Sequence, residues 1–436
     1  MRNGCDRCLI LLFLLALATA GCAPEKAEEI RTGNVIFIHP DGTAYNTWAA
    51  FRIMSEGPDG MTNWDRMDEM GLYRAHQLDA IGTSSNAGAT AHAFGVKAEM
   101  NDYGVDPDRP FKSLSRKDFS IMIEAKQAGY SVGVINSGHI CEPGTGVFLA
   151  SAKSRSMNDE ISDRIIHSGA DLIFSGGEQL LLPKGVTGHF GRPGMRRDDR
   201  NLIEEAEGLG YTVVYTREEL LNLPADAERV LGIFAPRHTF NAYPEEDLKA
   251  RGMPLYDPDA PTLAEMTRAA LAFLERKGRP FLLVVEEEGT DNFGNANNAT
   301  GVLTALGRTD EAIGVVMDFI GREPETLLVM AADSDAGGMQ VHLVRDTDME
   351  KPLRDRQANR APVDGRDGTA SLPFLAGADR TGRRMGFAIS WATSGDVYGG
   401  VVARAHGLNA ELLPNNVDNT DIYRLMYATL FGRWLE

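Results

Sequence analysis

Acidic side chains stand at the ends of three apolar segments of the sequence. Asp41 ends "NVIFIHPD", Glu286 lies in "FLLVVEEE", and Asp333 ends "TLLVMAAD". A single acid in such a place more often caps a helix than takes part in chemistry. Further polar residues accompany these three, at Asp291, Asn295, Asp335 and Asp396. Because clustered carboxylates repel one another unless a cation neutralises them, the set predicts a site for a polyvalent metal ion.

Two adjacent serines open a segment of small and polar residues, "SSNAGATAHAFGVK" at 84–97. Almost none of its side chains can fill a hydrophobic core, which raises the question whether one serine is a nucleophile. A free serine hydroxyl is a poor nucleophile, and a metal ion or the N–H groups of a helix N-terminus can activate it. The alternative is that Ser84 and Ser85 only cap the helix that follows.

The elements that would position these residues follow an alternating pattern. Apolar, β-branched runs predict buried strands at 34–41, 131–136, 171–177, 211–215, 281–288 and 326–333, with helical patterns between them, such as 200–210 and 262–278. This alternation indicates an α/β fold with a large, mainly parallel sheet sandwiched by helices. Ligands gather at the carboxyl ends of such strands, so acids far apart in the sequence can converge there. Residues 343–386, rich in Arg, Asp and Gly, predict an inserted surface loop or cap.

The overall charge is strongly acidic. The chain has 436 residues, with 44 Lys and Arg against 62 Asp and Glu, and a formal net charge of −18. Such a surface argues against a nucleic-acid partner. An anionic substrate would need a local attraction, which a bound cation supplies.

The N-terminus predicts export. Arg2 and Arg7 precede the apolar run "LILLFLLALATA" at 9–20, and Gly21-Cys22 follows. The run is short for a membrane span and has the anatomy of a signal peptide. A small-residue stretch that ends in Cys22 is similar to a bacterial lipoprotein cleavage site. The alternative is an ordinary cleaved signal in which Cys22 is incidental.

This interpretation divides the chain into three parts. We expect residues 1–21 to be a lipoprotein signal peptide, residues 22–33 a flexible tether, and residues 34–436 the catalytic domain. The mature protein would be exported and anchored to a membrane through a lipid on Cys22, on the periplasmic or outer-membrane face. Cys141 would then be the one unmodified cysteine, so no intrachain disulfide is expected.

Five segments of the chain, in the same order, resemble the alkaline phosphatase family. They are "NVIFIHPDG", "TSSNAGATAHAFGVK", "FLLVVEEEGTDNFGN", "LLVMAADSDAGG" and "SWATSGDVYGG". They are similar to the first metal-binding strand, the nucleophile segment and three later metal-binding segments of that family. The matches extend over residues 34–400, most of the mature chain. The resemblance implies the fold of that family and the metal-dependent hydrolysis of phosphate esters.

The resemblance also implies roles for individual residues. Alignment from 95–97 (Gly-Val-Lys) puts Ser85 at the nucleophile position and Ser84 where the best-studied members carry Asp. Arg155, seven residues past Phe148, matches the arginine that grips phosphate in the family. Its guanidinium could hold two phosphate oxygens in a fork, while the alternative is a surface arginine.

A third, magnesium-type metal position is implied near "SGHICEPGTG" at 137–146. The family commonly has Thr-His-Ala-Thr-Pro in this region, and the spacing here is shifted. Glu142 and Thr145 are the candidate substitutes for its ligands. His139 could belong to the same position, although an isolated histidine is more often a structural donor.

The chain departs from the family at the zinc-binding histidines. The three histidine positions align with Asn295, Ser334 and Asp396, whereas the carboxylates are kept as Asp41, Glu286, Asp291 and Asp333. Asp335 could compensate for Ser334. Zinc favours imidazole and thiolate ligands, whereas oxygen ligands suit Mg²⁺, Ca²⁺ or Mn²⁺. We therefore expect Mg²⁺ or Ca²⁺ as the cofactor, without excluding zinc.

Three functions follow as hypotheses. The leading one is a metal-dependent phosphomonoesterase that acts on a small phosphate ester through a phosphoserine intermediate. The second is a related hydrolase of phosphodiesters or other anionic esters. The third is a catalytically weak surface protein that binds metal. The relatives are often dimers, so a homodimer is a further expectation by analogy.

Overall fold

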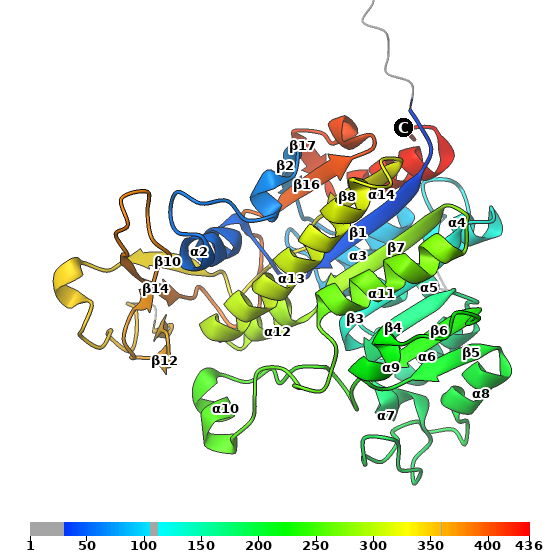
Figure 1. Ribbon diagram of the computed structural model, residues 1–436, viewed down its shortest axis with the longest axis horizontal. Coiled ribbons are helices and arrows are strands. Elements are labelled where there is room, and N and C mark those ends of the chain that lie inside the picture. The colour runs from blue at the N-terminus through cyan, green and yellow to red at the C-terminus, as the bar shows by residue number, and fades with distance from the viewer. Residues whose placement is uncertain (1–29, 105–111, 359) are drawn as a thin grey trace, which may run out of the picture.

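The computed structural model describes residues 30–104, 112–358 and 360–436 (Figure 1). The predicted signal peptide, the lipidation site Cys22 and most of the predicted tether lie outside the described residues. Within these ranges, none of the helices combines the length and the apolar character that crossing a membrane requires.

A ten-stranded sheet forms the centre of the molecule (Figure 1). Strand β16 is antiparallel to both of its neighbours, and the other pairs are parallel. This confirms the predicted α/β fold with a large, mainly parallel sheet. From edge to edge the strands are β17 (Asn416–Asp418), β2 (Glu69–Arg74), β16 (Val402–Gly407), β8 (Thr326–Met330), β1 (Asn34–Pro40), β7 (Phe281–Glu287), β3 (Ser131–His139), β4 (Leu172–Gly176), β6 (Arg229–Ile233) and β5 (Tyr211–Val214).

Helices cover both faces of this sheet, because successive side chains of a strand point to opposite sides. In β1, Val35 and Phe37 belong to one hydrophobic core, and Ile36 and Ile38 belong to the other. The first core contains α3 (Ser85–Phe94), α4 (Ile121–Gln127), α5 (Pro143–Leu149), α6 (Asn158–His167), α7 (Glu178–Leu181), α8 (Leu202–Gly208) and α14 (Asn419–Phe431). The second contains α2 (Tyr45–Ser55), α9 (Arg217–Leu221), α11 (Leu263–Arg276), α12 (Gly289–Asn295) and α13 (Ala299–Ile320).

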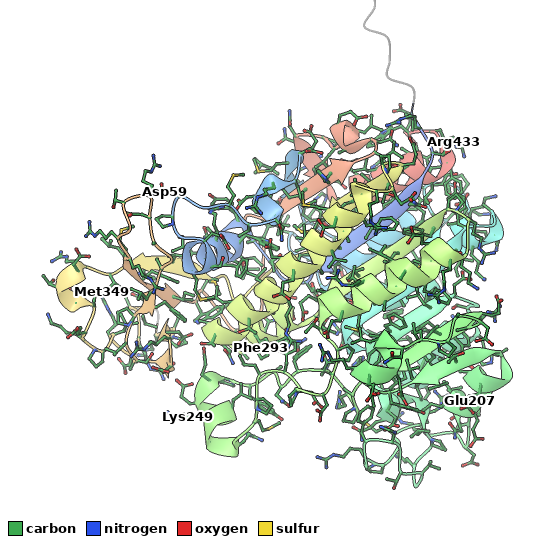
Figure 2. The ribbon with its side chains drawn as sticks, in the orientation of Figure 1. Asp59, Glu207, Lys249, Phe293, Met349 and Arg433 are labelled. Carbon is green, nitrogen blue, oxygen red and sulfur yellow. The ribbon has the colours of Figure 1, made fainter. Side chains whose placement is uncertain are left out.

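Local sequence signals explain how these helices begin and face the sheet. Helix α11 starts at a capping box, in which Thr262 and Glu265 each bond the other's backbone N–H. Its residues Met266, Ala270 and Phe273 are buried on one side. Phe293 of α12 likewise points into the core (Figure 2), whereas the charged side chain of Glu207 lies at the periphery.

Residues 340–390 form a second, small antiparallel sheet that extends to the left in Figure 1. The segment predicted as an inserted loop or cap therefore contains ordered strands of five residues or fewer, too short to show a periodic pattern. The strands are β10 (Gln340–Leu343), β14 (Gly386–Ser390), β11 (Val363–Gly365) and β12 (Gly368–Thr369), with β13 (Phe374–Leu375) also paired to β14. Helix α10 (Glu245–Arg251) contacts β12.

Candidate metal centre and active site

The carboxyl ends of three neighbouring strands bring the predicted acids together. Strand β1 lies between β7 and β8, with His39 in register with Glu286 and Ile38 in register with Met330. Asp41 follows β1 and donates its backbone N–H to the Glu287 carbonyl at 3.2 Å. The side chains of Asp41, Glu286 and Asp333 are all fully buried.

Asp41 lies at the centre of this cluster. A carboxylate oxygen of Asp41 is within 4.8 Å of ligand atoms on Glu288 and Asp291, and another such group joins Asp41 to His39 and Glu286. Asp333 interacts with Asp41 from the neighbouring strand. One small volume therefore holds carboxylates that come from three strand ends.

Helix α3, which begins at Ser85, packs against these acids. Ser85 is its first residue and is almost fully buried. A Cβ atom at Gly88, one turn further along, would lie 2.5 Å from Cβ of Asp333, so the small residue allows the helix to approach that acid. The Ser84 hydroxyl donates to the Met100 carbonyl at 3.1 Å. Within the described residues, Ser84 makes no side-chain capping hydrogen bond to this helix.

A second group of predicted ligands lies where α12 ends. The Asn295 side-chain amide donates to Asp291 at 3.1 Å and to Asp396 at 2.9 Å, so all three come together. Asp396 is positioned by the short pairing of β15 (Asp396–Val397) with β9 (Asp335–Ala336). Asp335 lies against Gly399, where a Cβ atom would be 2.1 Å from its Oδ2.

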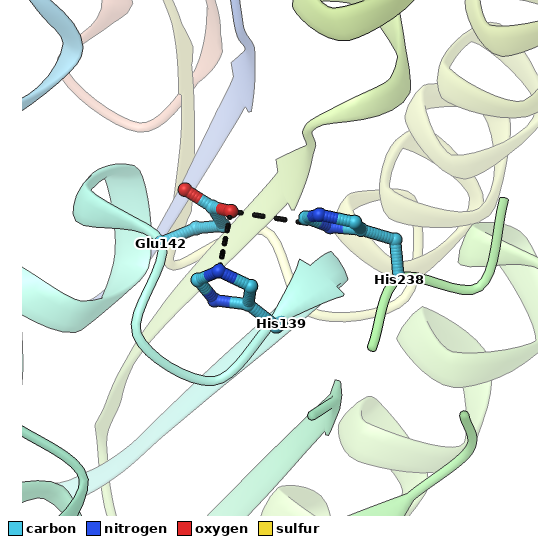
Figure 3. A group of neighbouring side chains, drawn as sticks. All are labelled: His139, Glu142 and His238. Carbon is cyan, nitrogen blue, oxygen red and sulfur yellow. Dashed lines mark ion pairs between the residues drawn. The ribbon is translucent and has the colours of Figure 1, made fainter. Parts of the chain in front are cut away.

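The residues of the predicted third position lie around Glu286. Thr145 accepts a hydrogen bond from Asn136 at 2.8 Å, and Asn136 also donates to Glu286 Oε2. Glu142 adjoins this group, because its charge raises the pKa values of Glu286 and Glu288. Its Oε1 is 3.0 Å from His139 Nε2 (Figure 3), and its Oε2 is 3.5 Å from the Arg155 guanidinium. Half of the Arg155 side chain is exposed, which leaves it open to an anion.

Two residues of this cluster, His39 and Glu288, were not predicted as ligands. The His39 Nδ1–H donates to the Ala331 carbonyl at 2.7 Å, and its Nε2 is 3.4 Å from Asp41. Both residues lie two positions from a predicted ligand, His39 from Asp41 and Glu288 from Glu286. Their position beside predicted ligands at the ends of β1 and β7 was the signal that could have found them.

Burial and mutual repulsion shift the pKa values of these acids. Burial raises the pKa of Glu286 to about 8, and the charges of Asp41 and Glu142 act in the same direction, although His39 opposes them. Burial and neighbouring carboxylates also raise the pKa values of Glu288, Asp291 and Asp333 well above the usual range. These groups bind either protons or a cation at neutral pH.

Asp41 is the exception in this group. Burial acts to raise its pKa, but the ion pair with His39, whose Nε2 lies 3.4 Å away, outweighs burial and lowers it. Asp41 is therefore the carboxylate of the cluster that stays ionised most readily.

The unpartnered atoms of the cluster fit a bound cation. Buried oxygens without a partner are costly, and a divalent ion would satisfy several of them at once. Among the described residues, those without a hydrogen-bond partner include both carboxylate oxygens of Asp41 and of Asp333, Glu286 Oε1, Glu288 Oε2, Asn295 Oδ1, Ser334 Oγ and Asp335 Oδ1. Nearly all are the hard oxygen donors that Mg²⁺ and Ca²⁺ prefer.

We predict that the chelated protein loses stability as the pH rises from 6.5 to 8. The pKa of Glu286 is about 8 in the folded protein and 4.5 in an unfolded chain. In this pH window Glu286 therefore holds its proton in the folded state and has released it in the unfolded state. His39, whose pKa rises to about 10 because Asp41 outweighs its burial, contributes with the same sign. The expected loss of unfolding free energy is about 2 kcal/mol.

Chemical unfolding at the two pH values, with and without a chelator, measures this loss. Glu245 lies outside the carboxylate cluster, and burial raises its pKa to about 8. Glu245→Gln is therefore a control: it should reduce the loss of unfolding free energy with pH by the same amount with and without metal. Equal stability of the chelated protein at both pH values would contradict the prediction.

Comparison with known proteins identifies the lineage. The family model described as alkaline phosphatase matches residues 32–361, well over half of the chain. The chain belongs to the alkaline phosphatase family. This confirms the resemblance seen in the sequence.

Individual relatives are distant in sequence. The repressible alkaline phosphatase of Saccharomyces cerevisiae is 27% identical over 76% of this chain and 59% of its own length. Alkaline phosphatase 4 of Bacillus subtilis is 27% identical over 74% of this chain and 66% of its own length. The chain thus spans about three fifths to two thirds of these curated alkaline phosphatases.

Solved alkaline phosphatases share the fold. The enzyme of the Antarctic bacterium TAB5 superimposes with a TM-score of 0.71 at 20% identity, covering 92% of this chain and 100% of the other. A variant of that enzyme with Mg bound in its M3 site has a TM-score of 0.69 at 20% identity, with 93% and 100% coverage. These similarities show that the chain has the same fold.

Proposed function

We propose that this alkaline phosphatase family member is a metal-dependent phosphomonoesterase. The observation that carries the proposal is the packing of α3 against Asp333, which in turn interacts with Asp41, because the first residue of this helix is the buried Ser85. This arrangement suits a serine nucleophile beside a divalent cation.

We assign the cation ligands to the carboxylate cluster. Asp41 would be shared, with Asp333 and Ser334 on the side of Ser85, and Asp291, Asn295 and Asp396 on the other side. Glu286, with Thr145 nearby, would belong to a third position, to which Glu288 and His39 are added. Divalent cations bound there would neutralise the carboxylates and lower the pKa of a serine hydroxyl and of water.

The oxygen-rich donor set favours Mg²⁺ or Ca²⁺ over zinc at these positions. Asn295 and Asp396 contribute oxygen where the family has histidine. Asn295 Oδ1 has no partner among the described residues, and a turn of the amide would direct it at an ion between Asp291 and Asp396. The TAB5 variant with Mg in its M3 site gives a precedent for magnesium in this fold.

In the proposed reaction, Arg155 and Ser85 act on the phosphate group. The Arg155 guanidinium would hold two non-bridging oxygens and orient phosphorus for in-line attack. Ser85 Oγ, after losing its proton, forms the bond to phosphorus while the bond to the alcohol oxygen breaks. The alcohol leaves with a proton, and water then hydrolyses the phosphoserine to return Ser85 and inorganic phosphate.

We further propose that the enzyme is exported, anchored through a lipid on Cys22, and active as a homodimer on small phosphate esters. Ser84, whose hydroxyl bonds the Met100 carbonyl, would border the substrate rather than contact phosphorus. Asp335, held against Gly399, would support Asp396 rather than replace Ser334 as a ligand.

A comparison of two substrates tests the proposed function. We expect p-nitrophenyl phosphate to be hydrolysed at least about 100-fold faster than bis-p-nitrophenyl phosphate, because a diester offers one charged oxygen fewer to Arg155 and the cations. A chelator should abolish the activity, and Mg²⁺ or Ca²⁺ should restore it with an alkaline optimum. Metal content is measured on the same samples.

Three outcomes would contradict parts of this proposal. Faster hydrolysis of the diester would indicate a phosphodiesterase. Full restoration by zinc alone, with a neutral optimum, would overturn the assignment of hard cations. Metal uptake without any turnover would leave a metal-binding surface protein as the function.

A further inference from the structure

Two histidines, His139 and His238, lie beside the Glu142 carboxylate (Figure 3). His139 is the last residue of β3, Glu142 directly precedes α5, and His238 lies in the loop after β6. Glu142 Oε1 is 3.0 Å from His139 Nε2 and 3.9 Å from His238 Nδ1. The three donor atoms lie within 4.8 Å of one another, a spacing that one ion can bridge.

Ring stacking holds both imidazoles in place. The His139 and His238 rings are stacked with centroids 4.9 Å apart and an interplanar angle of 22°. The His238 ring also stacks on Phe240, at 5.0 Å and 28°. The two ligands are therefore oriented by packing before any ion binds, which favours a defined site.

The backbone fixes the loop that carries His238. Thr239 donates to the Ser137 carbonyl twice, from its N–H at 3.0 Å and from its hydroxyl at 2.7 Å. A Cβ atom at residue 176 would lie only 1.8 Å from the Arg237 carbonyl oxygen, so Gly176 is needed for the loop to approach β4. These contacts hold the loop against the ends of β3 and β4.

The protein groups alone do not satisfy this cluster. One carboxylate oxygen serves two imidazoles, and His238 Nδ1 has no hydrogen-bond partner in the part of the chain that the structure describes. A neutral imidazole is the form that binds a metal ion.

We propose that His139 Nε2, Glu142 Oε1 and His238 Nδ1 bind a zinc ion, at a site that adjoins the carboxylate cluster and uses none of its carboxylates. Two imidazoles and one carboxylate form a common zinc ligand set, and the fourth position stays open to solvent. The chain thus has a nitrogen-rich site although it lacks the zinc-binding histidines of its family. This inference does not require that the proposed phosphatase activity is correct.

The other histidine-containing groups are less suited to this role. In the group Asp163, His167 and Glu205, Arg200 already pairs with both carboxylates, so a cation is in place. The group around His39 shares Asp41 and Glu286 with the proposed catalytic cations. Both groups provide controls for the assignment.

The test is a zinc titration of chelated protein in saturating Mg²⁺, which fills the oxygen-rich positions first. We expect the wild-type protein to bind one zinc ion, and His238→Ala to bind it about 100-fold more weakly or worse. His167→Ala and His39→Gln should bind zinc as the wild type does. Co²⁺ in place of zinc should give the intense visible absorption of a four-coordinate site with nitrogen ligands, and His238→Ala should lose it.

A second variant separates binding from folding. His238→Gln keeps a polar side chain in the loop, and its thermal midpoint without zinc should match that of the wild type while the zinc affinity falls. Zinc affinity that is unchanged in both His238 variants would overturn the proposal. Loss of zinc in His39→Gln instead, or no zinc bound by the wild type, would also overturn it, and the histidine pair would then only orient Glu142.

Discussion

Replacing Ser85 with alanine is expected to lower kcat for p-nitrophenyl phosphate by about 10⁴-fold. The change removes the hydroxyl that would attack phosphorus and leaves the carboxylates and Arg155 in place. Alanine is the best helix former, so α3 should start at the same residue. Metal content and thermal midpoint should stay close to wild-type values, because Asp41 and Asp333 supply the main ligands on this side.

The neighbouring serine is a matched control. Ser84→Ala deletes the same atom one residue earlier, where the hydroxyl bonds the Met100 carbonyl. We expect its kcat within about threefold of the wild type and a stability loss of about 1 kcal/mol. Acid quenching during turnover, followed by peptide mass spectrometry, should find phosphate on Ser85. Phosphate on Ser84, or full activity of Ser85→Ala, would rule out the assigned nucleophile.

Asp333→Asn is expected to abolish activity and at the same time stabilise the metal-free protein. The loss of activity should be at least about 10³-fold, with at least one metal ion fewer, because a neutral amide is a weak ligand for a hard cation. The metal-free protein should gain stability because Asp333 is fully buried beside Asp41, and both burial and Asp41 raise its pKa. An amide has the same shape but cannot ionise, so it removes the free-energy cost of burying this carboxyl beside Asp41.

The pH dependence distinguishes this explanation from a packing effect. At pH 8.5 the free energy of unfolding of the variant should exceed that of the chelated wild type by about 1 kcal/mol or more. At pH 5 the difference should shrink, because the raised pKa of Asp333 costs the folded state less free energy there than at pH 8.5. Denaturant unfolding in chelator measures both values. The comparison is Asp310→Asn, at a half-buried acid whose pKa is also raised but which has backbone N–H partners. A stability gain that is the same at both pH values would contradict the electrostatic origin.

The sequence predicted the parts of the site that depend on strand ends. The runs that end at Asp41 and Asp333 are long, apolar and continuous, so their carboxyl edge could be inferred without coordinates. His39 and Glu288 could have been found because each lies two positions from a predicted ligand at a strand end. His238 could not, because it lies in an irregular loop, and its approach to Glu142 depends on the order of β3, β4 and β6 in the sheet.

The small sheet and the amide of Asn295 lie beyond sequence reasoning for a similar reason. Strands of two to five residues carry too few positions for a period, and their pairing is set by tertiary contacts such as Trp391 Nε1 with Asp364 at 2.7 Å. The direction of the Asn295 amide depends on which carboxylates stand beside it, and Asp396 comes from a segment about one hundred residues away.

The pairing of β9 with β15 has a mechanical consequence. The chain leaves the central sheet through β9, builds the small sheet, and returns through β15, which starts at Asp396. An ion held between Asp396 and Asp291 would therefore fix the small sheet to α12 at the point where its segment joins the rest of the chain. The affinity for this ion must include the entropy cost of ordering the small sheet. Residues of the small sheet that lie far from the ion can therefore change how tightly the ion binds.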